Sequence, residues 1–283
     1  MLKLCAFADE ASTVFSEQLA ALKKHSIPYI ELRGLDGKNV SSLTPDEARE
    51  YKKQLDAAGI RVWSIGSPIG KMKLSDDFDA HLEKLRATLE IAKIFDTHRI
   101  RMFSFYETEG RRDEVFANLR RMVKLADDYG VVLYHENEKD IYGDIADRVL
   151  DIRANVAGLR YIFDPANFLE VGQDIPDAQK KLINVTDYFH IKDVIKETRQ
   201  LVPAGQGNGE IVKMLESIKI DTTLTIEPHL KVFKGYSETS DVTLNSAHVY
   251  ETNSEAFDAA VAGIKDCLKK AGYVERDGGF VKE

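Results

Sequence analysis

The chain has 283 residues, of which 43% are hydrophobic, and its 39 Lys and Arg against 47 Asp and Glu give a formal charge of −8. This composition is typical of a globular protein and excludes a disordered chain, while the acidic balance argues against nucleic-acid binding, which needs Lys and Arg to neutralise phosphates. No apolar run in the sequence approaches the roughly 20 residues that cross a bilayer. Asp9 and Glu10 come too early for a secretory signal, and two cysteines cannot form a disulfide framework. We therefore expect a cytoplasmic protein without a membrane partner.

Short runs rich in Val, Ile, Leu, Phe and Tyr alternate with longer segments of helical periodicity along the chain. Continuous apolar runs of this length are typical of parallel strands that are buried on both faces. Between them, Phe78–Phe95 and Val115–Tyr129 repeat apolar residues every three or four positions, and Thr44-Pro45-Asp46-Glu47 is a helix start with a capping residue. The runs that we interpret as strands are Leu2–Phe7, Tyr29–Leu32, Arg61–Ile65, Arg99–Phe103, Val131–His135, Arg160–Phe163, Tyr188–Ile191 and Leu224–Ile226.

These eight runs recur about every 25 to 40 residues, which is the unit length of an eight-fold (β/α) barrel. We therefore predict an α/β fold, a (β/α)8 TIM barrel that forms a single domain over residues 1–283. A doubly wound open sheet is the competing architecture, but neither GxGxxG after the first strand nor GxxxxGK[ST] occurs. Residues 232–253 have weak periodicity, so we expect an irregular excursion there, as an active-site cover or an oligomer contact, before a last helix over Ser254–Ala271.

Polar residues stand at the ends of four consecutive predicted strands in the second half of the chain. Glu136 follows the fifth strand, Asp164 the sixth and Glu227 the eighth, and His190 lies near the end of the seventh. One such residue is usually a solvated loop residue or a helix cap. The working residues of this kind of barrel, however, lie at the carboxyl ends of the strands, and adjacent strands are about 4.8 Å apart. The four side chains are therefore expected to converge at the barrel mouth.

Three carboxylates packed together without compensation would repel one another and raise one another's pKa. A bound cation removes this conflict, and three oxygen donors with one imidazole suit a fairly hard divalent ion. The sequence thus predicts one divalent metal ion, with Mn²⁺ as the best fit and Mg²⁺, Co²⁺ and Zn²⁺ also compatible.

The strand-end series HEN, FDPANF, FHIKD and TIEPHL, with the glycine-rich VPAGQGNGE after the seventh strand, resembles the xylose isomerase-like TIM barrel superfamily. Within it, the chain is similar to the sugar phosphate isomerase/epimerase group, which includes ketose 3-epimerases, hydroxypyruvate isomerase and inosose dehydratase. The resemblance implies that Glu136, Asp164, His190 and Glu227 are the metal ligands and that Glu136 and Glu227 are the catalytic acid/base pair. It also implies a small-molecule sugar or sugar-derivative substrate, and it leaves a homodimer or a homotetramer open.

We therefore predict a divalent-metal-dependent isomerase/epimerase of a sugar or sugar derivative, in which a proton moves between the two glutamates through a metal-stabilised enediolate. Two positions depart from the ketose 3-epimerases, which carry a histidine where this chain has Asn167 and an arginine where it has Lys196. Arg199 is a candidate for the missing guanidinium, with an exposed loop arginine as the alternative, and Asn167 is retained as a candidate substrate contact.

Three further residues are candidates for the substrate site. Lys192 is two positions beyond His190, on the same side of an extended chain, where it would hold a substrate oxygen or phosphate or support the ligands from behind. His229 stands in the same relation to Glu227 and would orient its carboxylate. Glu31, with Arg33, would contact substrate hydroxyls, and a buried ion pair between them is the alternative. Loop 203–210 exposes glycine N–H groups that suit a phosphate, but in this superfamily it is normally a turn that leads into a helix.

Three other functions compete with this prediction. An inosose-type dehydratase would use the same metal site but expel a hydroxyl group, and a non-catalytic sugar-binding protein would use it without chemistry. An apurinic endonuclease on the same barrel would need more histidines at strand ends and a basic face. A chain with seven histidines and a charge of −8 does not offer these.

Overall fold

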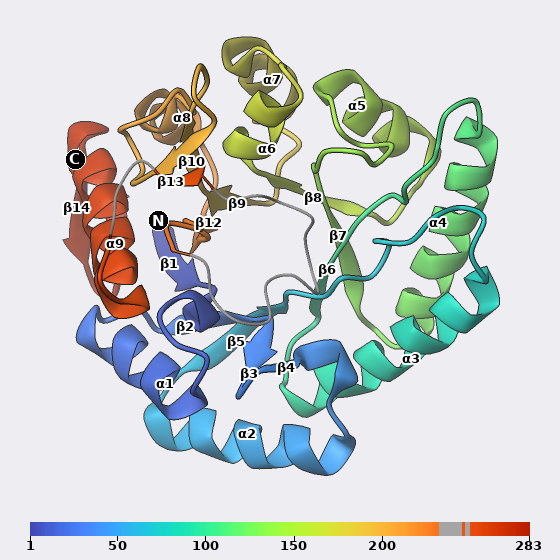
Figure 1. Ribbon diagram of the computed structural model, residues 1–283, viewed down its shortest axis with the longest axis horizontal. Helices are drawn as coiled ribbons and strands as arrows, with labels where there is room; N and C mark the ends of the chain where they lie inside the picture. Colours follow the sequence, from blue (N-terminus) through green and yellow to red (C-terminus); the bar gives the residue numbers. More distant parts are fainter. Residues whose placement is uncertain (232–244, 247–249) are drawn as a thin grey trace.

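The structure, a computed structural model, describes residues 1–231, 245–246 and 250–283. Its main sheet closes on itself because the last barrel strand, β12, pairs in parallel with the first, β1, in a register that runs from Leu2 opposite Thr222 to Ala6 opposite Ile226. This closure confirms the predicted barrel and excludes the doubly wound open sheet (Figure 1). The eight parallel strands are β1 (Leu2–Ala6), β2 (Tyr29–Leu32), β5 (Arg61–Ile65), β6 (Arg99–Met102), β7 (Val132–Glu136), β8 (Arg160–Phe163), β9 (Tyr188–Ile191) and β12 (Thr222–Ile226).

Helices surround the barrel and bury their apolar faces against it (Figure 1). The predicted start at Thr44 is confirmed: its hydroxyl accepts the N–H of Glu47, whose carboxylate accepts the N–H of Thr44. Among the described residues, no helix is long and apolar enough to cross a membrane. The helices are α1 (Phe15–Lys24), α2 (Pro45–Ala58), α3 (Phe78–Ile94), α4 (Arg112–Asp128), α5 (Ala146–Asn155), α6 (Pro165–Glu170), α7 (Ile175–Leu182), α8 (Ile211–Ser217) and α9 (Asn253–Lys270), with 3-10 turns η1 (Ala8–Glu10) and η2 (Val40–Ser42).

Helix α4 shows why the periodic segments fold as they do. Its apolar positions Val115, Leu119, Met122, Val123 and Ala126 are all buried, as the spacing predicts. Burial of a large aliphatic side chain contributes about 1.5 to 3 kcal/mol, so such a face outweighs the weak helical propensity of a short isolated segment. The helix begins at Arg112, three residues before the predicted start, because the polar first turn carries no apolar signal.

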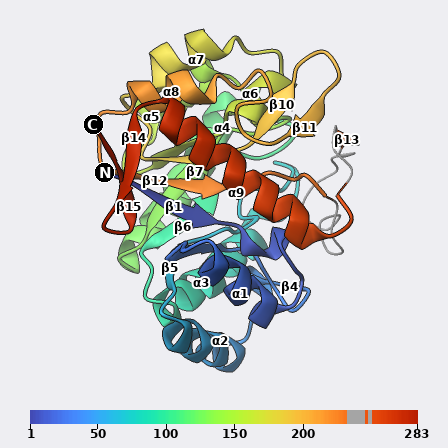
Figure 2. The ribbon, with the colours of Figure 1, turned by 90° about the vertical axis from the view of Figure 1, so that its left-hand side faces the viewer.

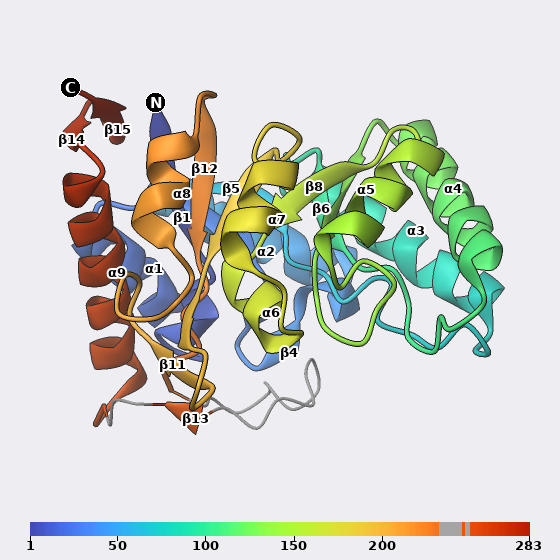
Figure 3. The ribbon, with the colours of Figure 1, turned by 90° about the horizontal axis from the view of Figure 1, so that it is seen from above.

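The carboxyl terminus adds a hairpin that the sequence did not predict. Strands β14 (Tyr273–Arg276) and β15 (Gly279–Lys282) pair with each other, and β15 joins β1 in antiparallel fashion where Leu2 faces Phe280. The hairpin lies with both chain termini at the amino ends of the barrel strands (Figure 3). Helix α9, which precedes the hairpin, packs against β12, where the pairing of β12 with β1 closes the barrel (Figure 2).

The opposite end of the barrel carries two small sheets. Strand β10 (Asp193–Ile195) pairs with β11 (Gln200–Val202), which pairs with β13 (Asn245–Ser246), and β3 (Gly34–Leu35) pairs with β4 (Lys38–Asn39). Figure 3 shows β11 and β13 at the end away from the termini, where the parallel strands finish. The irregular excursion predicted for residues 232–253 lies mostly outside the described residues; within it, the structure describes β13 and the start of α9 at Asn253.

Candidate metal centre at the carboxyl ends of the strands

Four strand ends bring one histidine and three carboxylates together. Glu136 is the last residue of β7, His190 lies within β9, and Asp164 and Glu227 directly follow β8 and β12. Each offers one ligand atom, and these atoms all lie within 4.8 Å of one another, with all four residues buried. The structure thus places together the four residues that the strand-end pattern singles out, because parallel strands in a barrel finish at the same end.

The inner atoms of this cluster crowd around the imidazole of His190. Its Nδ1 lies 2.8 Å from Glu136 Oε1 and 2.9 Å from Glu227 Oε2, and Lys192 Nζ lies 3.0 Å from Asp164 Oδ2. Among the described residues, Glu227 Oε2 and Asp164 Oδ2 are buried without a hydrogen bond of regular geometry. Oxygen atoms that converge with an imidazole nitrogen are the donor set of a hard to borderline divalent ion, so these residues fit a metal.

The outer oxygen of each carboxylate is held by the protein. Glu136 Oε2 accepts a hydrogen bond from Arg101 Nη1 at 3.1 Å, and Glu227 Oε1 accepts one from Arg33 Nη1 at 2.9 Å. Asp164 caps α6, where its Oδ1 accepts the N–H of Asn167 at 3.0 Å. One oxygen of each carboxylate is therefore anchored and the other is directed inward, as expected of ligands that are oriented by a surrounding shell.

Arg101 is a site residue that the sequence analysis missed. It lies in the buried strand β6 and contacts both glutamates, with Nη1 3.1 Å from Glu136 Oε2 and 3.5 Å from Glu227 Oε1. Arg33 also donates to Asp9 at 2.8 and 3.0 Å and to Glu10 at 3.1 Å. The available signal for Arg101 was its position between Ile100 and Met102 in a predicted barrel strand, because a guanidinium is rarely buried without acidic partners.

The ionisation of the cluster follows from its burial and its close charges. Burial opposes the charged forms of Asp164, His190 and Glu227. It raises the pKa of Asp164 to about 7, even though Lys192 acts in the other direction. For Glu227, burial is outweighed by His190, Lys192 and His229, which hold its pKa well below the usual range. For His190, burial is outweighed by Glu136, Glu31 and Glu227, which raise its pKa well above 6.5. The metal-free cluster thus retains protons that a divalent ion would displace on binding.

Glu31 lies behind His190. It is 1% exposed, and its Oε2 is 3.3 Å from Nε2 of the histidine, whereas Glu136 and Glu227 contact Nδ1. Tyr188 Oη donates to its Oε1 at 3.0 Å and Thr225 Oγ1 to its Oε2 at 2.9 Å.

His229 is held in place by Glu10. The Glu10 carboxylate accepts the His229 N–H at 2.7 Å and lies 2.9 Å from its Nδ1, while Nε2 is 3.5 Å from Glu227 Oε1. The backbone of His229 has φ +48°, a left-handed conformation that is unfavourable for a residue with a side chain and that the bond to Glu10 supports. Glu10, Glu227 and His229 also lie close enough to hold a metal, but the Arg33 guanidinium already contacts both glutamates.

The other predicted site residues divide between the cluster and the surface. Asn167 is buried, and its Nδ2 lies 3.5 Å from Glu136 Oε1 and donates to Asn137 O at 2.9 Å. Lys192 is buried in its ion pair with Asp164. Arg199 and Lys196 are exposed in the segment that joins β10 to β11, so Arg199 is not among the buried residues of the cluster.

The glycine-rich loop binds a carboxylate of its own chain. The N–H groups of Gly205 and Gly207 donate to Asp193 Oδ2, and those of Gly209 and Val194 donate to Oδ1, all at 2.8 to 3.0 Å. The loop then leads into α8, as expected for a turn. Its anion-binding N–H groups are therefore occupied by Asp193 rather than offered to a phosphate.

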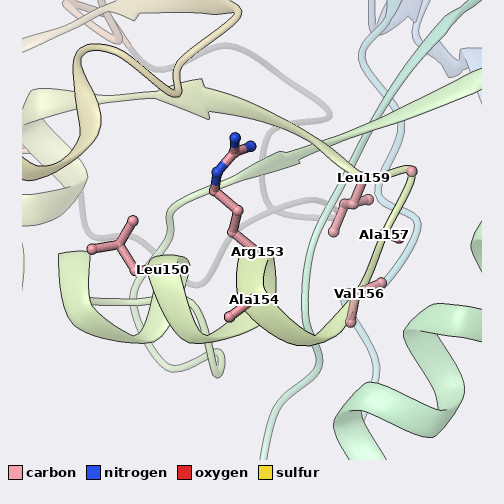
Figure 4. A pocket seen from close by; sticks show the side chains of 7 residues that line it. Leu150, Arg153, Ala154, Val156, Ala157 and Leu159 are labelled. Atoms are coloured by element: carbon pink, nitrogen blue, oxygen red, sulfur yellow. The ribbon is translucent and has the colours of Figure 1, made fainter.

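Two hollows lie away from the strand-end cluster. One, of about 460 Å³, lies between the end of α5 and the start of β8, where small aliphatic residues and Arg153 line it (Figure 4). The other, of about 450 Å³, lies beside the amino ends of β5 and β6, where Arg61 and Arg99 stack on Tyr29 and Trp63. Neither is lined by one of the four clustered residues, so the barrel mouth remains the candidate site.

Comparison with known proteins agrees with the geometry. A family model described as the xylose isomerase-like TIM barrel matches residues 19–263. No curated protein sequence matches the chain. Among solved structures, D-psicose 3-epimerase with D-tagatose from Clostridium cellulolyticum H10 has a TM-score of 0.73 at 14% identity, over 95% of this chain and 99% of that one.

Two further solved structures are similar to a comparable degree. The probable 3-DHS dehydratase AsbF from Bacillus anthracis has a TM-score of 0.69 at 17% identity, over 94% of this chain and 98% of that one. The IOLI protein with a binding zinc atom has a TM-score of 0.70 at 17% identity, over 95% and 99% of the two chains. These likenesses show the fold, and the family match covers most of the sequence. The chain therefore belongs to the xylose isomerase-like TIM barrel family.

Proposed function

We propose that this protein is a divalent-metal-dependent isomerase or epimerase that acts on a sugar or a sugar derivative. The observation that carries the proposal is the convergence of Glu136, Asp164, His190 and Glu227, whose ligand atoms lie within 4.8 Å of one another in a buried site. Similar folds are seen in a sugar epimerase crystallised with a ketose and in a protein with bound zinc, which supports both the substrate class and the need for a metal.

The donor set favours Mn²⁺, with Mg²⁺, Co²⁺ or Zn²⁺ as substitutes, because three carboxylates and one imidazole offer mostly hard oxygen ligands. When bound, the ion would polarise a substrate carbonyl and stabilise the negative charge that develops on its oxygen. Arg33 and Arg101 would keep Glu227 and Glu136 in place as substrate enters, since each guanidinium holds the outer oxygen of one carboxylate.

Glu136 and Glu227 are the proposed proton-transfer pair. Both contact the same edge of His190 and the same guanidinium nitrogen of Arg101, so they face one space from two different strands. One carboxylate removes a proton from the substrate carbon beside the carbonyl, and the other delivers a proton from a second direction. Delivery to the same carbon gives an epimer, and delivery to the neighbouring carbon gives an isomer.

A dehydratase is the second candidate, and Lys192 is the residue that favours it. Its ammonium lies 3.0 Å from Asp164 Oδ2, at the edge of the cluster, where it could protonate a departing hydroxyl group. The fold of the probable dehydratase AsbF is also similar. Asn167, where ketose 3-epimerases carry a histidine, is a further departure from the epimerase pattern.

Proton NMR in D₂O with Mn²⁺ and a panel of ketoses separates the candidates. An isomerase or epimerase exchanges a carbon-bound proton for deuterium without losing water, whereas a dehydratase yields an unsaturated product. Glu136→Gln and Glu227→Gln are expected to lower turnover at least 100-fold, because proton transfer by a positioned carboxylate contributes about that much. If both variants bind ketoses normally and wild type turns over none of them, the protein is a binding protein instead.

A further inference from the structure

We propose that Glu31 is the positioning residue for His190, which it orients so that Nδ1, and not Nε2, is directed at the metal centre. The inference rests on the proposed metal site and extends it to a residue outside the ligand set. It starts from the position of Glu31, whose carboxylate lies 3.3 Å from Nε2, while Glu136 and Glu227 lie at Nδ1 of the same ring.

A neutral imidazole carries one proton and one lone pair, and the acceptor that faces it decides which nitrogen keeps the proton. An ionised carboxylate only accepts hydrogen bonds, so Glu31 draws the proton to Nε2. The lone pair is then on Nδ1, which lies 2.8 and 2.9 Å from the two glutamates of the cluster. Histidines that bind metals commonly donate their other N–H to a carboxylate in this way.

Hydrogen bonds and burial hold the Glu31 carboxylate in its position behind His190. Tyr188 and Thr225 donate hydroxyl hydrogens to its two oxygens, at 3.0 and 2.9 Å, and so occupy it as an acceptor from two neighbouring strands. At 1% exposure it is too deep in the barrel to contact a substrate that enters at the mouth. We therefore assign Glu31 a role behind His190, in place of the substrate contact that the sequence predicted.

The ring itself is fixed by aromatic neighbours. Phe7 contacts His190 edge to face, with ring centroids 5.3 Å apart, and Tyr188 lies at 5.7 Å with a tilt of 59°. His190 is fully buried, so a flip of its ring would have to displace both aromatic side chains. Packing thus sets the ring plane and Glu31 sets the tautomer.

Glu31→Gln tests the assignment, with Mn²⁺ binding measured by isothermal titration calorimetry. The amide either presents its own N–H to Nε2, which moves the proton to Nδ1, or accepts without a negative charge. Either arrangement weakens the metal site, and we expect a 10- to 100-fold loss of Mn²⁺ affinity. Glu138→Gln is the matched control, because it removes one carboxylate charge from a partly buried pair with Lys71 that does not include His190.

The two variants distinguish orientation from charge. A loss in Glu31→Gln that clearly exceeds the loss in Glu138→Gln supports the assignment, and equal losses overturn it, because the carboxylate would then act only as a charge. If wild type itself binds no divalent ion, the proposed function fails at that earlier step, and the outcome is recognisable without any variant.

Nitrogen-15 NMR of histidine-labelled wild-type protein with Zn²⁺ gives a readout that does not depend on how the Glu31 and Glu138 variants fold. We expect Nδ1 of His190 to be metal-bound and Nε2 to carry a proton that is protected from exchange by its bond to Glu31. The His190→Asn variant identifies the signal. Coordination of Zn²⁺ through Nε2 would refute the assignment.

Discussion

Replacement of Asp193 by asparagine should break hydrogen bonds that hold the glycine-rich loop and so lower the stability of the protein. Each oxygen of Asp193 accepts two backbone N–H groups, Gly205 and Gly207 on one side and Gly209 and Val194 on the other. Whichever oxygen becomes the amide NH₂, two N–H donors then face another donor. Hydrogen bonds to a charged acceptor contribute about 1.5 to 3 kcal/mol each. Two of them, partly replaced by water at the loop surface, give an expected loss of about 3 kcal/mol.

Urea unfolding followed by circular dichroism measures this loss as a lower midpoint at an unchanged slope. Asp128→Asn, which changes an exposed side chain at the end of α4, should stay within about 0.5 kcal/mol. Gly207→Ala disturbs the same contact from the loop, because its added Cβ would lie 2.4 Å from Asp193 Oδ1, too close for the present position of the carboxylate. A loss below about 1 kcal/mol in Asp193→Asn would show that the four bonds do not hold the loop.

Three further outcomes follow from the same contacts. Mn²⁺ at 100 times its Kd should stabilise the protein by about 2.7 kcal/mol, which corresponds to roughly 5 °C in Tm for a chain of this size. Asp164→Asn should remove most of that gain because Asp164 supplies an inward oxygen, and equal Tm shifts in the two proteins would contradict the ligand assignment. His81 Nε2 accepts the Gly70 N–H, and burial lowers the pKa of this histidine to about 4. Because the unfolded chain takes up this proton at higher pH, stability should be complete above about pH 6.5 and fall by about 3 kcal/mol towards pH 4. His81→Gln keeps a hydrogen-bond acceptor but does not titrate, so it should reduce the loss of stability between pH 6.5 and pH 4. An unchanged loss in the variant would show that His81 is not its source. Glu10→Ala should lower the free energy of unfolding by about 2 to 4 kcal/mol in chemical denaturation, because the backbone N–H of His229 loses its acceptor and the buried guanidinium of Arg33 loses a partner. A change within 0.5 kcal/mol would show that the left-handed backbone of His229 needs no support from Glu10.

The sequence by itself determined the barrel and the four clustered residues. The strands Tyr29–Leu32, Arg61–Ile65, Arg160–Phe163 and Tyr188–Ile191 have the predicted bounds, because each is a short run rich in large aliphatic and aromatic residues. Residues that follow such runs lie at one end of a parallel barrel whatever the details of packing. Local pattern was therefore enough to bring Glu136, Asp164, His190 and Glu227 to one place.

Tertiary structure alone decided which neighbours those residues have. Arg101 reaches Glu227 and Glu31 reaches His190 across more than a hundred positions of sequence, and only the closed barrel with its strand register makes them adjacent. The sequence left phosphate binding open at the glycine loop, beside the favoured turn, because it indicates exposed N–H groups but not the Asp193 carboxylate that accepts hydrogen bonds from them. The terminal hairpin depends in the same way on the edge offered by β1 at Leu2. Side-chain pairing between distant segments is a property of three-dimensional contact, and no local periodicity encodes it.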